Sequence, residues 1–213
     1  FIISACQKQY DSITTIDERN IQSYLQSNNL AMQQYKNTGV YYQILDVGAV
    51  STPTMQYSDR VPLILMLRSL DNTYSSLDTF SANNRYSNFL GYFKPDSLRS
   101  VVKEMLKNRN GSIRVIVPSR FAYGKNGNSG IPENASLDYT VKTLDENKLA
   151  QYDDISINKY LTANSLTGYT KSTSGIYYKI TSPGSSASIT STSTVTVEYT
   201  GKLFNGSIFS QAT

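Results

Sequence analysis

Tyrosine is the most abundant aromatic residue in this sequence, so it is the main material from which a binding pocket could be built. The 213 residues include 17 Tyr and 7 Phe, with no Trp and no His. Without His, a His-based catalytic triad, an imidazole general base and most zinc sites are excluded. The single Cys excludes an intramolecular disulfide. The chemistry to expect is that of aromatic walls and hydrogen-bond donors, with no cofactor.

The overall charge and hydrophobicity narrow the class of protein. Hydrophobic residues make up 39% of the chain and charged residues 17%, which is typical of a globular protein of one or two domains. The net charge of +4 is scattered without a block of Lys and Arg, so no nucleic-acid partner is expected. No run of about 20 apolar residues is present, so no membrane-spanning helix is predicted.

The most distinctive motif has two parts near the middle of the chain. Val117–Gly124 reads VPSRFAYG, and Asn128–Leu137 reads NSGIPENASL. Together they resemble the last third of an FKBP-type peptidyl-prolyl isomerase domain, where a P-S-x-x-A-Y-G segment and a Gly-rich loop precede I-P-x-N-A/S-x-L and a final strand. The resemblance implies an α+β fold, an FKBP-like antiparallel twisted sheet wrapped around a short helix.

The activity of that family needs neither a nucleophile nor a metal. The slow step is rotation about the partly double C–N bond before proline, and the trans and cis forms differ by only about 1 kcal/mol. A concave apolar pocket can hold the proline ring, desolvate the amide and favour its twisted form. The lack of His suits this chemistry, and it suits a binding protein equally well.

The resemblance implies four pocket residues in the first half of the chain. Tyr123 matches the tyrosine whose hydroxyl reaches the substrate carbonyl, and Ile131 matches an aliphatic wall. Tyr139 takes the place of an aromatic residue, usually Phe, and Leu98 aligns with the pocket floor, where many members have Trp. Leu98 and Tyr139 could equally be ordinary core residues.

Several positions depart from the family pattern. A hairpin of the same family recurs later in the chain, at Val195–Phe209. Aligning Leu70 with Leu203 of that hairpin puts Met66 where the hairpin has Tyr199, so an aromatic wall is replaced. The family's Phe-Asp pair has two possible counterparts, Tyr74-Ser75 and Leu77-Asp78. These departures predict weak turnover, or binding without turnover, in the first domain.

Two segments recur 136 residues apart. Asp17–Leu30 returns as Asp153–Leu166, and Gly39–Ile44 returns as Gly175–Ile180. Two matches in the same register indicate a duplicated unit. We therefore expect a tether at 1–16, a first FKBP-like domain at 17–149, and the leading helix and first third of a second domain at 150–213.

The hairpin at Val195–Phe209 belongs to this second domain. Val195–Phe209 resembles the family's V-x-V-x-Y-T-G-x-L-x-x-G-x-x-F hairpin, with a turn signal at Asn205-Gly206. The resemblance makes Tyr199 and Phe209 pocket residues and puts Ser210 where the family usually has Asp. We expect the sequence to be a fragment of a longer protein, because this copy stops before the family's helix and last strands.

Hydrophobic patterns predict the elements that position these residues. A helix beginning at Asp17 or Glu18 would bury Ile21, Tyr24 and Leu25, most simply against its own domain. Strands are expected at 40–45, 61–70, 113–117 and 137–144, the last with Asp138 and Thr140 on its exposed face. A helix is expected from Pro95 to an exit at Gly111, and its apolar face would consist of Leu98, Val101, Val102, Met105 and Leu106.

The N-terminus carries a possible lipidation signal. Ile3-Ser4-Ala5-Cys6 fits a bacterial lipobox, in which small residues precede the Cys that receives diacylglycerol. A buried structural Cys is the alternative. The sequence predicts a lipid-anchored protein of the bacterial cell envelope that faces the periplasm or the outer surface.

The function expected is therefore a peptidyl-prolyl cis-trans isomerase that assists folding of envelope proteins. Its partners would be proline-containing protein segments and the membrane, reached through the lipid anchor. The alternatives are a non-catalytic binding or chaperone lipoprotein with the same fold, and a structural envelope protein.

Overall fold

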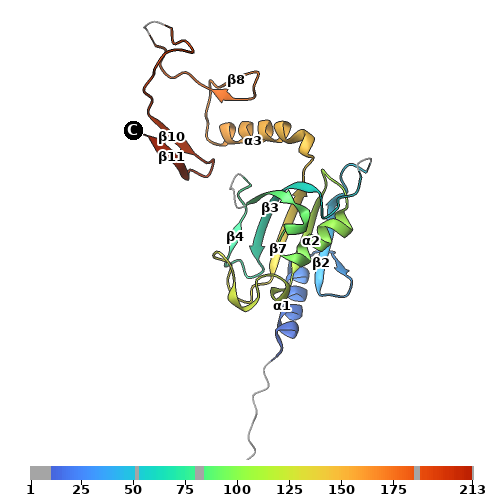
Figure 1. The fold of residues 1–213 in the computed structure, drawn as a ribbon. Helices are drawn as coiled ribbons and strands as arrows, with labels where there is room; N and C mark the ends of the chain where they lie inside the picture. Colours follow the sequence, from blue (N-terminus) through green and yellow to red (C-terminus); the bar gives the residue numbers. More distant parts are fainter. Residues whose placement is uncertain (1–10, 51–52, 80–83, 185–187, 213) are drawn as a thin grey trace, which may run out of the picture. The chain divides into compact units, whose positions relative to one another are not determined.

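The computed structural model describes residues 11–50, 53–79, 84–184 and 188–212. The chain divides into two compact units (Figure 1). Unit 1 comprises residues 1–79 and 83–146, and unit 2 comprises 80–82 and 147–213. The predicted lipobox and Cys6 lie outside the described residues.

Unit 1 is built on a seven-stranded antiparallel sheet. Its strands run in the order β1-β2-β6-β7-β3-β4, and β5 also pairs with β3. The bounds of the seven strands are β1 Gln33–Tyr35, β2 Val40–Asp46, β3 Arg60–Ser69, β4 Ser75–Ser76, β5 Arg85–Phe89, β6 Ser112–Val117 and β7 Leu137–Thr143. The predicted strands correspond to β2, β3, β6 and β7, whereas the short or polar strands β1, β4 and β5 were not expected.

One face of this sheet packs on a short helix. Helix α2 spans Asp96–Val101 and continues as one π-helical turn, Val102–Leu106. Its apolar residues form the main core together with β3, β6 and β7. The predicted exit at Gly111 is wrong: Lys107, with φ of 65°, ends the helix. Its backbone N–H still donates to the Val102 carbonyl.

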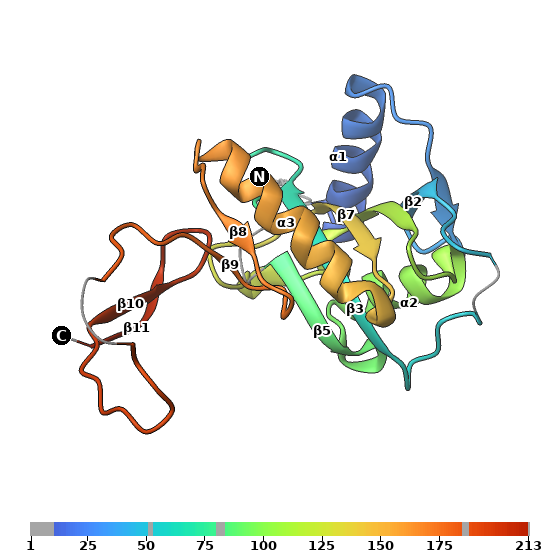
Figure 2. The same ribbon diagram turned by 90° about the horizontal axis from the view of Figure 1, so that it is seen from above.

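Helix α1 (Ile13–Ser27) packs on the opposite face of the sheet. Ile21 and Tyr24 are buried against Tyr41 and Ile116, and Leu25 is partly buried beside them, so the predicted apolar face does pack on its own unit. Figure 2 shows α1 and α2 on opposite sides of β3 and β7. The helix begins earlier than predicted because the Ser12 hydroxyl caps it, accepting the Thr15 N–H at 3.2 Å.

The presence of α1 changes the prediction for β7. Leu137, Tyr139 and Val141 face the main core as expected, but Asp138 is only 5% exposed. The predicted exposed face is therefore wrong at Asp138, because α1 covers that part of the sheet and Tyr24 bonds to its carboxylate.

Short 3-10 turns join the main elements of unit 1. They span Leu90–Tyr92, Ser119–Phe121 and Gly124–Asn126, and a fourth, Glu146–Lys148, leads into unit 2. The second of these lies within the VPSRFAYG motif.

The described residues of unit 2 form one helix and two small hairpins. Helix α3 spans Leu149–Ala163, and the strands are β8 Thr170–Lys171, β9 Tyr177–Tyr178, β10 Tyr199–Lys202 and β11 Ile208–Ala212. The repeat of Asp17 at Asp153 implied a helix that starts near Asp153, but α3 begins earlier, at Leu149. It starts and ends 136 residues after α1 (149 − 13 and 163 − 27). The predicted hairpin is confirmed as β10–β11, with Gly206 at a φ of 87° in its turn.

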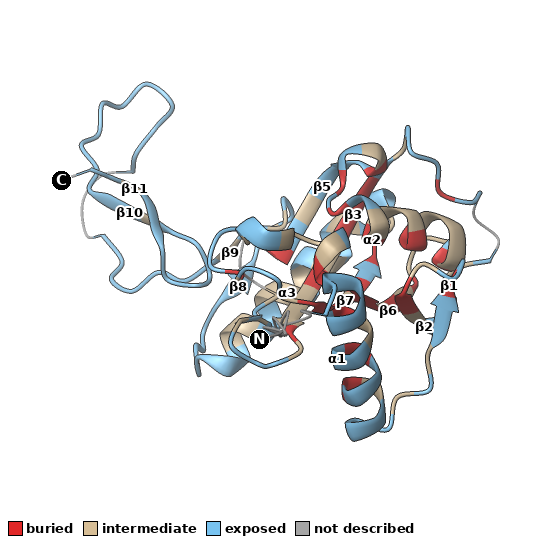
Figure 3. Cartoon of the chain, turned by 90° about the horizontal axis from the view of Figure 1, so that it is seen from below, coloured by how far each residue is buried: buried red, intermediate tan, exposed pale blue. Residues whose placement is uncertain are grey.

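Burial distinguishes the two units. Figure 3 shows β6 largely buried, whereas β10 and β11 are exposed. No described residue of 147–212 is buried. The clearest apolar contact of unit 2 stacks Tyr160 on Phe204, with ring centroids 4.2 Å apart. Unit 1 therefore holds the core on which a site can be built.

Candidate functional site

The four predicted pocket residues of unit 1 all belong to the main core or pack against it. Leu98 from α2, Ile131 from the loop before β7 and Tyr139 from β7 are all buried in the main core. Tyr123 is partly buried and packs against the same cluster. The structure therefore brings together side chains that are up to 41 residues apart in the sequence (139 − 98).

Local backbone geometry explains how Ile131 reaches this cluster. The backbone groups of Asn128 and Ile131 bond to each other, at 3.1 Å and 2.8 Å. Gly127 adopts a φ of 60°, and a Cβ there would lie only 2.3 Å from the Ile131 carbonyl oxygen. Only glycine fits at this point, so the Gly-rich loop has a direct structural role in placing Ile131.

The segment that carries Tyr123 is supported by a buried carboxylate from α1. Asp17, which is 1% exposed, accepts hydrogen bonds from the backbone N–H and the guanidinium of Arg120, both at 3.3 Å. It also accepts the Ser136 hydroxyl at 3.0 Å. Ser136 in turn accepts the Ser119 N–H at 3.1 Å. Sequence reasoning missed Asp17, because an acidic residue in a helix is ordinarily assumed to face solvent.

A fifth aromatic side chain, Tyr74, also packs against the cluster. Its ring lies beside the Gly-rich loop, since a Cβ on Gly130 would be 3.6 Å from it. Hydrogen bonds with Ser69 hold Tyr74 in place at the start of β4. Leu77 is 54% exposed. Of the two possible counterparts of the family's Phe-Asp pair, Tyr74-Ser75 is the one that puts a ring at the cluster.

The expected position of the replaced aromatic wall is wrong by one residue. Met66 pairs with Thr140, whereas Leu67 pairs with Tyr139. Directly paired residues of neighbouring strands share a face, and successive residues alternate between faces. Leu67 therefore packs against the cluster. The Met66 side chain belongs to the opposite face of the sheet.

Burial dominates the electrostatics of Tyr139. Desolvation raises the pKa of its hydroxyl far above the ordinary value, and the neighbouring Tyr123 and Tyr74 side chains raise it further. This buried hydroxyl has no hydrogen-bond partner of good geometry within the described ranges. Tyr139 is therefore protonated at every physiological pH, and it can act as a wall or a donor but not as a base.

The predicted residues of unit 2 lie on the β10–β11 hairpin. Tyr199 and Phe209 are 50% and 69% exposed. The Tyr199 hydroxyl is 3.1 Å from the Ser210 hydroxyl, and a Cβ on Gly201 would lie 2.8 Å from the Phe209 ring. The hairpin brings these side chains near one another but does not enclose them.

The described residues offer neither a metal site nor a membrane-spanning helix. No group of three or more potential metal-ligating side chains occurs in the described part of the chain. Within those ranges there is also no helix with the length and apolar character needed to cross a membrane. What the geometry of unit 1 offers is an apolar core on an α+β scaffold, with the partly buried rings of Tyr123 and Tyr74 packed against it.

Comparison with known proteins agrees with this picture. No family model matches the chain. The FKBP-type peptidyl-prolyl cis-trans isomerase FkpA of Escherichia coli strain K12 is 30% identical over 116 residues, which cover 51% of this chain and 38% of FkpA. FkpA from the E. coli strains CFT073 and O157:H7 matches equally well. The chain is thus similar to an FKBP-type isomerase over about half of its own length, and it spans less than half the length of these curated proteins.

Solved structures show similarity at lower sequence identity. The crystal structure of FkpA from E. coli has a TM-score of 0.47 and 23% identity, with 62% of each chain covered. A peptidyl-prolyl cis-trans isomerase from Pseudomonas syringae pv. tomato has a TM-score of 0.45 and 15% identity, with 64% of this chain and 98% of that chain covered. The sheet and helix α2 of unit 1 themselves confirm the α+β prediction of an antiparallel sheet with a short helix.

Proposed function

We propose that unit 1 is a peptidyl-prolyl cis-trans isomerase that acts on proline-containing protein segments. The observation that carries this proposal is the convergence of Tyr123, Ile131, Tyr139 and Leu98 on one cluster, in a chain related to FKBP-type isomerases. Tyr74 adds a second partly buried ring at the edge of that cluster.

The chemistry follows from burial rather than from proton transfer. A proline ring resting on Ile131, Tyr139 and Leu98 would remove the preceding amide from water, which lowers the cost of losing its double-bond character. Tyr123, the least buried of the four, is the donor placed to hold a substrate carbonyl. Each step is differential binding of the twisted amide, so no residue has to titrate.

The direct test is an isomerase assay on the full chain with a Pro-containing peptide. Tyr123→Phe should lower kcat/KM, because a hydrogen bond that forms with the substrate carbonyl is lost. Tyr57→Phe, at a tyrosine 39% exposed and paired with Arg99 and Lys103, is the matched control and should leave activity unchanged. Equal activity in the wild type and Tyr123→Phe would exclude the assigned role.

A non-catalytic peptide-binding module is the second candidate. It is favoured by Leu67 and Leu98, which are aliphatic where an aromatic wall and floor are expected. Tight binding of Pro-containing peptides without measurable turnover, in the same assay, would select this alternative.

We further propose that the protein is a lipoprotein of the bacterial envelope, where it would assist protein folding. The support is the Ile3–Cys6 motif. When the protein is expressed with its signal peptide, labelled fatty acid should enter the wild type and not Cys6→Ala. Equal labelling of both would refute the anchor.

A further inference from the structure

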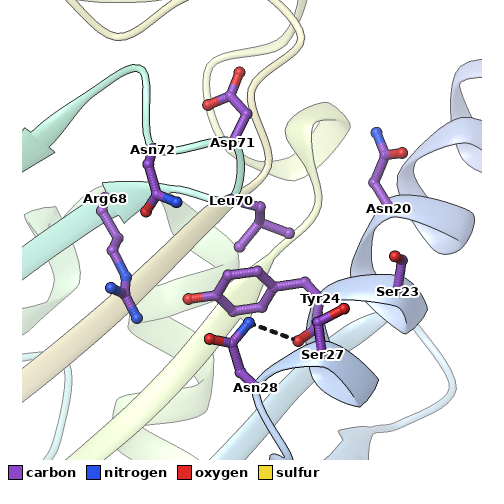
Figure 4. Close-up of a pocket in the computed structure, with 9 residues that line it drawn as sticks. All are labelled: Asn20, Ser23, Tyr24, Ser27, Asn28, Arg68, Leu70, Asp71 and Asn72. Atoms are coloured by element: carbon purple, nitrogen blue, oxygen red, sulfur yellow. Dashed lines mark hydrogen bonds between the residues drawn. The ribbon is translucent and has the colours of Figure 1, made fainter.

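A cavity lies on the other face of the sheet in unit 1, away from the tyrosine cluster. It has a volume of about 430 Å³ and lies between α1 and the end of β3 with the turn that follows (Figure 4). Arg68 lines it, whereas the adjacent Leu67 packs against the cluster. The alternation of side chains along β3 therefore separates this cavity from the proposed prolyl site.

Two residues that line the cavity, Tyr24 and Arg68, belong to a buried ion network. The Asp138 carboxylate accepts two hydrogen bonds from Arg114, at 2.9 Å and 2.7 Å, and one from the Tyr24 hydroxyl at 2.8 Å. Arg68 donates to the same carboxylate through Nε alone, at 3.3 Å. Burial opposes ionisation of Asp138, but the hydrogen bonds and charges of Arg114, Tyr24 and Arg68 hold its pKa below the ordinary value.

Charge in this network is unbalanced. Two arginines share one buried carboxylate, which leaves one positive charge. The nearby Asp71 is not paired with Arg68 among the described residues: its carboxylate accepts from Ser69 and Thr73, and Figure 4 shows it pointing away from the guanidinium. The Arg68 side chain is 36% exposed, so its two terminal nitrogens remain open to a ligand.

The remaining walls combine a donor with an apolar surface. The side-chain amide of Asn72 has no hydrogen-bond partner among the described residues and lines the cavity beside Arg68. Leu70 and the Tyr24 ring form an apolar surface next to it (Figure 4). A planar guanidinium fork matches a carboxylate, and an adjacent apolar wall fits an aliphatic group attached to it.

We propose that this cavity binds a carboxylate of a polypeptide, with Arg68 and Asn72 as donors and an apolar side chain against Leu70 and Tyr24. A singly charged carboxylate fits better than a phosphate dianion, since only one positive charge is unbalanced and Asp71 lies close by. The ligand would be an apolar C-terminal residue, or an acidic side chain beside an apolar one. The cavity would be a second binding site for the polypeptide, in addition to the proposed prolyl site.

Three peptide probes test the ligand chemistry on the full chain. N-acetyl-Ala-Leu carries a free C-terminal carboxylate, its C-terminal amide carries none, and N-acetyl-Glu-Leu-amide carries only a side-chain carboxylate. Titrations are followed by NMR through the backbone amide signals of Asn28 and Asn72. The two carboxylate probes should shift these signals and the neutral amide should not, and the tighter carboxylate probe identifies the source. Equal shifts with the neutral amide, no shift with any probe, or tighter binding of inorganic phosphate would overturn the proposal.

Variants tie the binding to this cavity. Arg68→Gln should weaken the carboxylate probe about tenfold or more, as expected for loss of hydrogen bonds to a charged group. Ser27→Phe fills the cavity from the exposed side of α1 without altering the ion network. It should also weaken binding of the carboxylate probe, and it therefore tests the site even if Arg68→Gln is poorly folded. Tyr123→Phe should bind the probe like the wild type, and Ser27→Phe should keep isomerase activity. Unchanged probe binding in Ser27→Phe would refute the site, whatever the outcome of the isomerase assay.

Discussion

Restoring aromatic residues at two positions of the cluster should raise isomerase activity. The change is Leu67→Tyr combined with Leu98→Trp. Leu67 is partly buried and faces Tyr139, and Leu98 is fully buried in the floor of the same cluster. Both substitutions extend an aromatic surface toward the place where the proline ring is proposed to rest.

The size of the effect follows from the value of aromatic contacts. Each contributes about 1 kcal/mol beyond the area it buries. Two such contacts made only with the twisted amide would lower the barrier by about 2 kcal/mol, which is roughly a 30-fold increase in kcat/KM. Leu98→Trp enlarges a closely packed position, so stability should fall by about 1–3 kcal/mol.

The assay is turnover of a Pro-containing peptide, with urea unfolding measured in parallel. Met66→Tyr with Leu98→Trp is the matched control, since Met66 pairs with Thr140 on the opposite face. That control keeps Leu98→Trp, so it should show the same stability cost and only the share of the gain that Leu98→Trp supplies, roughly fivefold. An equal gain from both double variants would refute the face assignment, and no gain from either would refute the idea that missing aromatic walls limit turnover.

Three further predictions concern stability. The depressed pKa of Asp138 means that its contribution is present above the ordinary Asp pKa of about 3.9 and is lost as the pH falls through the lower folded-state pKa. Asp138→Asn should therefore be less stable than the wild type in urea at pH 7, with a gap that narrows below pH 4, and a gap independent of pH would contradict this. Tyr139→Phe should raise stability by about 1 kcal/mol in the same assay, because it removes a buried hydroxyl without a well-placed partner, and a lower urea midpoint would be the contrary result. An isolated 151–213 peptide should show no cooperative thermal transition by circular dichroism, because no described residue of that range is buried, whereas residues 1–150 should unfold cooperatively.

Much of unit 1 could be predicted because its signals are local. The apolar run of β3, the alternation in β7 and the helical spacing of Leu98, Val101 and Val102 each specify an element within a few residues. The VPSRFAYG and NSGIPENASL segments could also be recognised alone, since glycines such as Gly127 are required by the backbone of the loop itself.

The ends of the helices, and the strands without an apolar pattern of their own, were harder to predict. The start of α1 depended on the Ser12 cap, and the end of α2 on the positive φ of Lys107. The polar strand β5 exists because it pairs along β3, and its own sequence has no strong alternation. Pairing of this kind involves residues distant in the chain, so no local pattern reports it.

The sequence by itself determined the fold class, the duplicated segments and the residue types available to the site. Only the tertiary structure decided which side chains share a face. A shift of one residue along a strand moves a side chain to the other face, so the choice between Leu67 and Met66 depended on pairing with β7. Asp17 and Asp138 are likewise buried only because α1 packs over the sheet. Asp17 lies on α1 and accepts from Arg120 and Ser136, and Asp138 accepts from Tyr24 of α1.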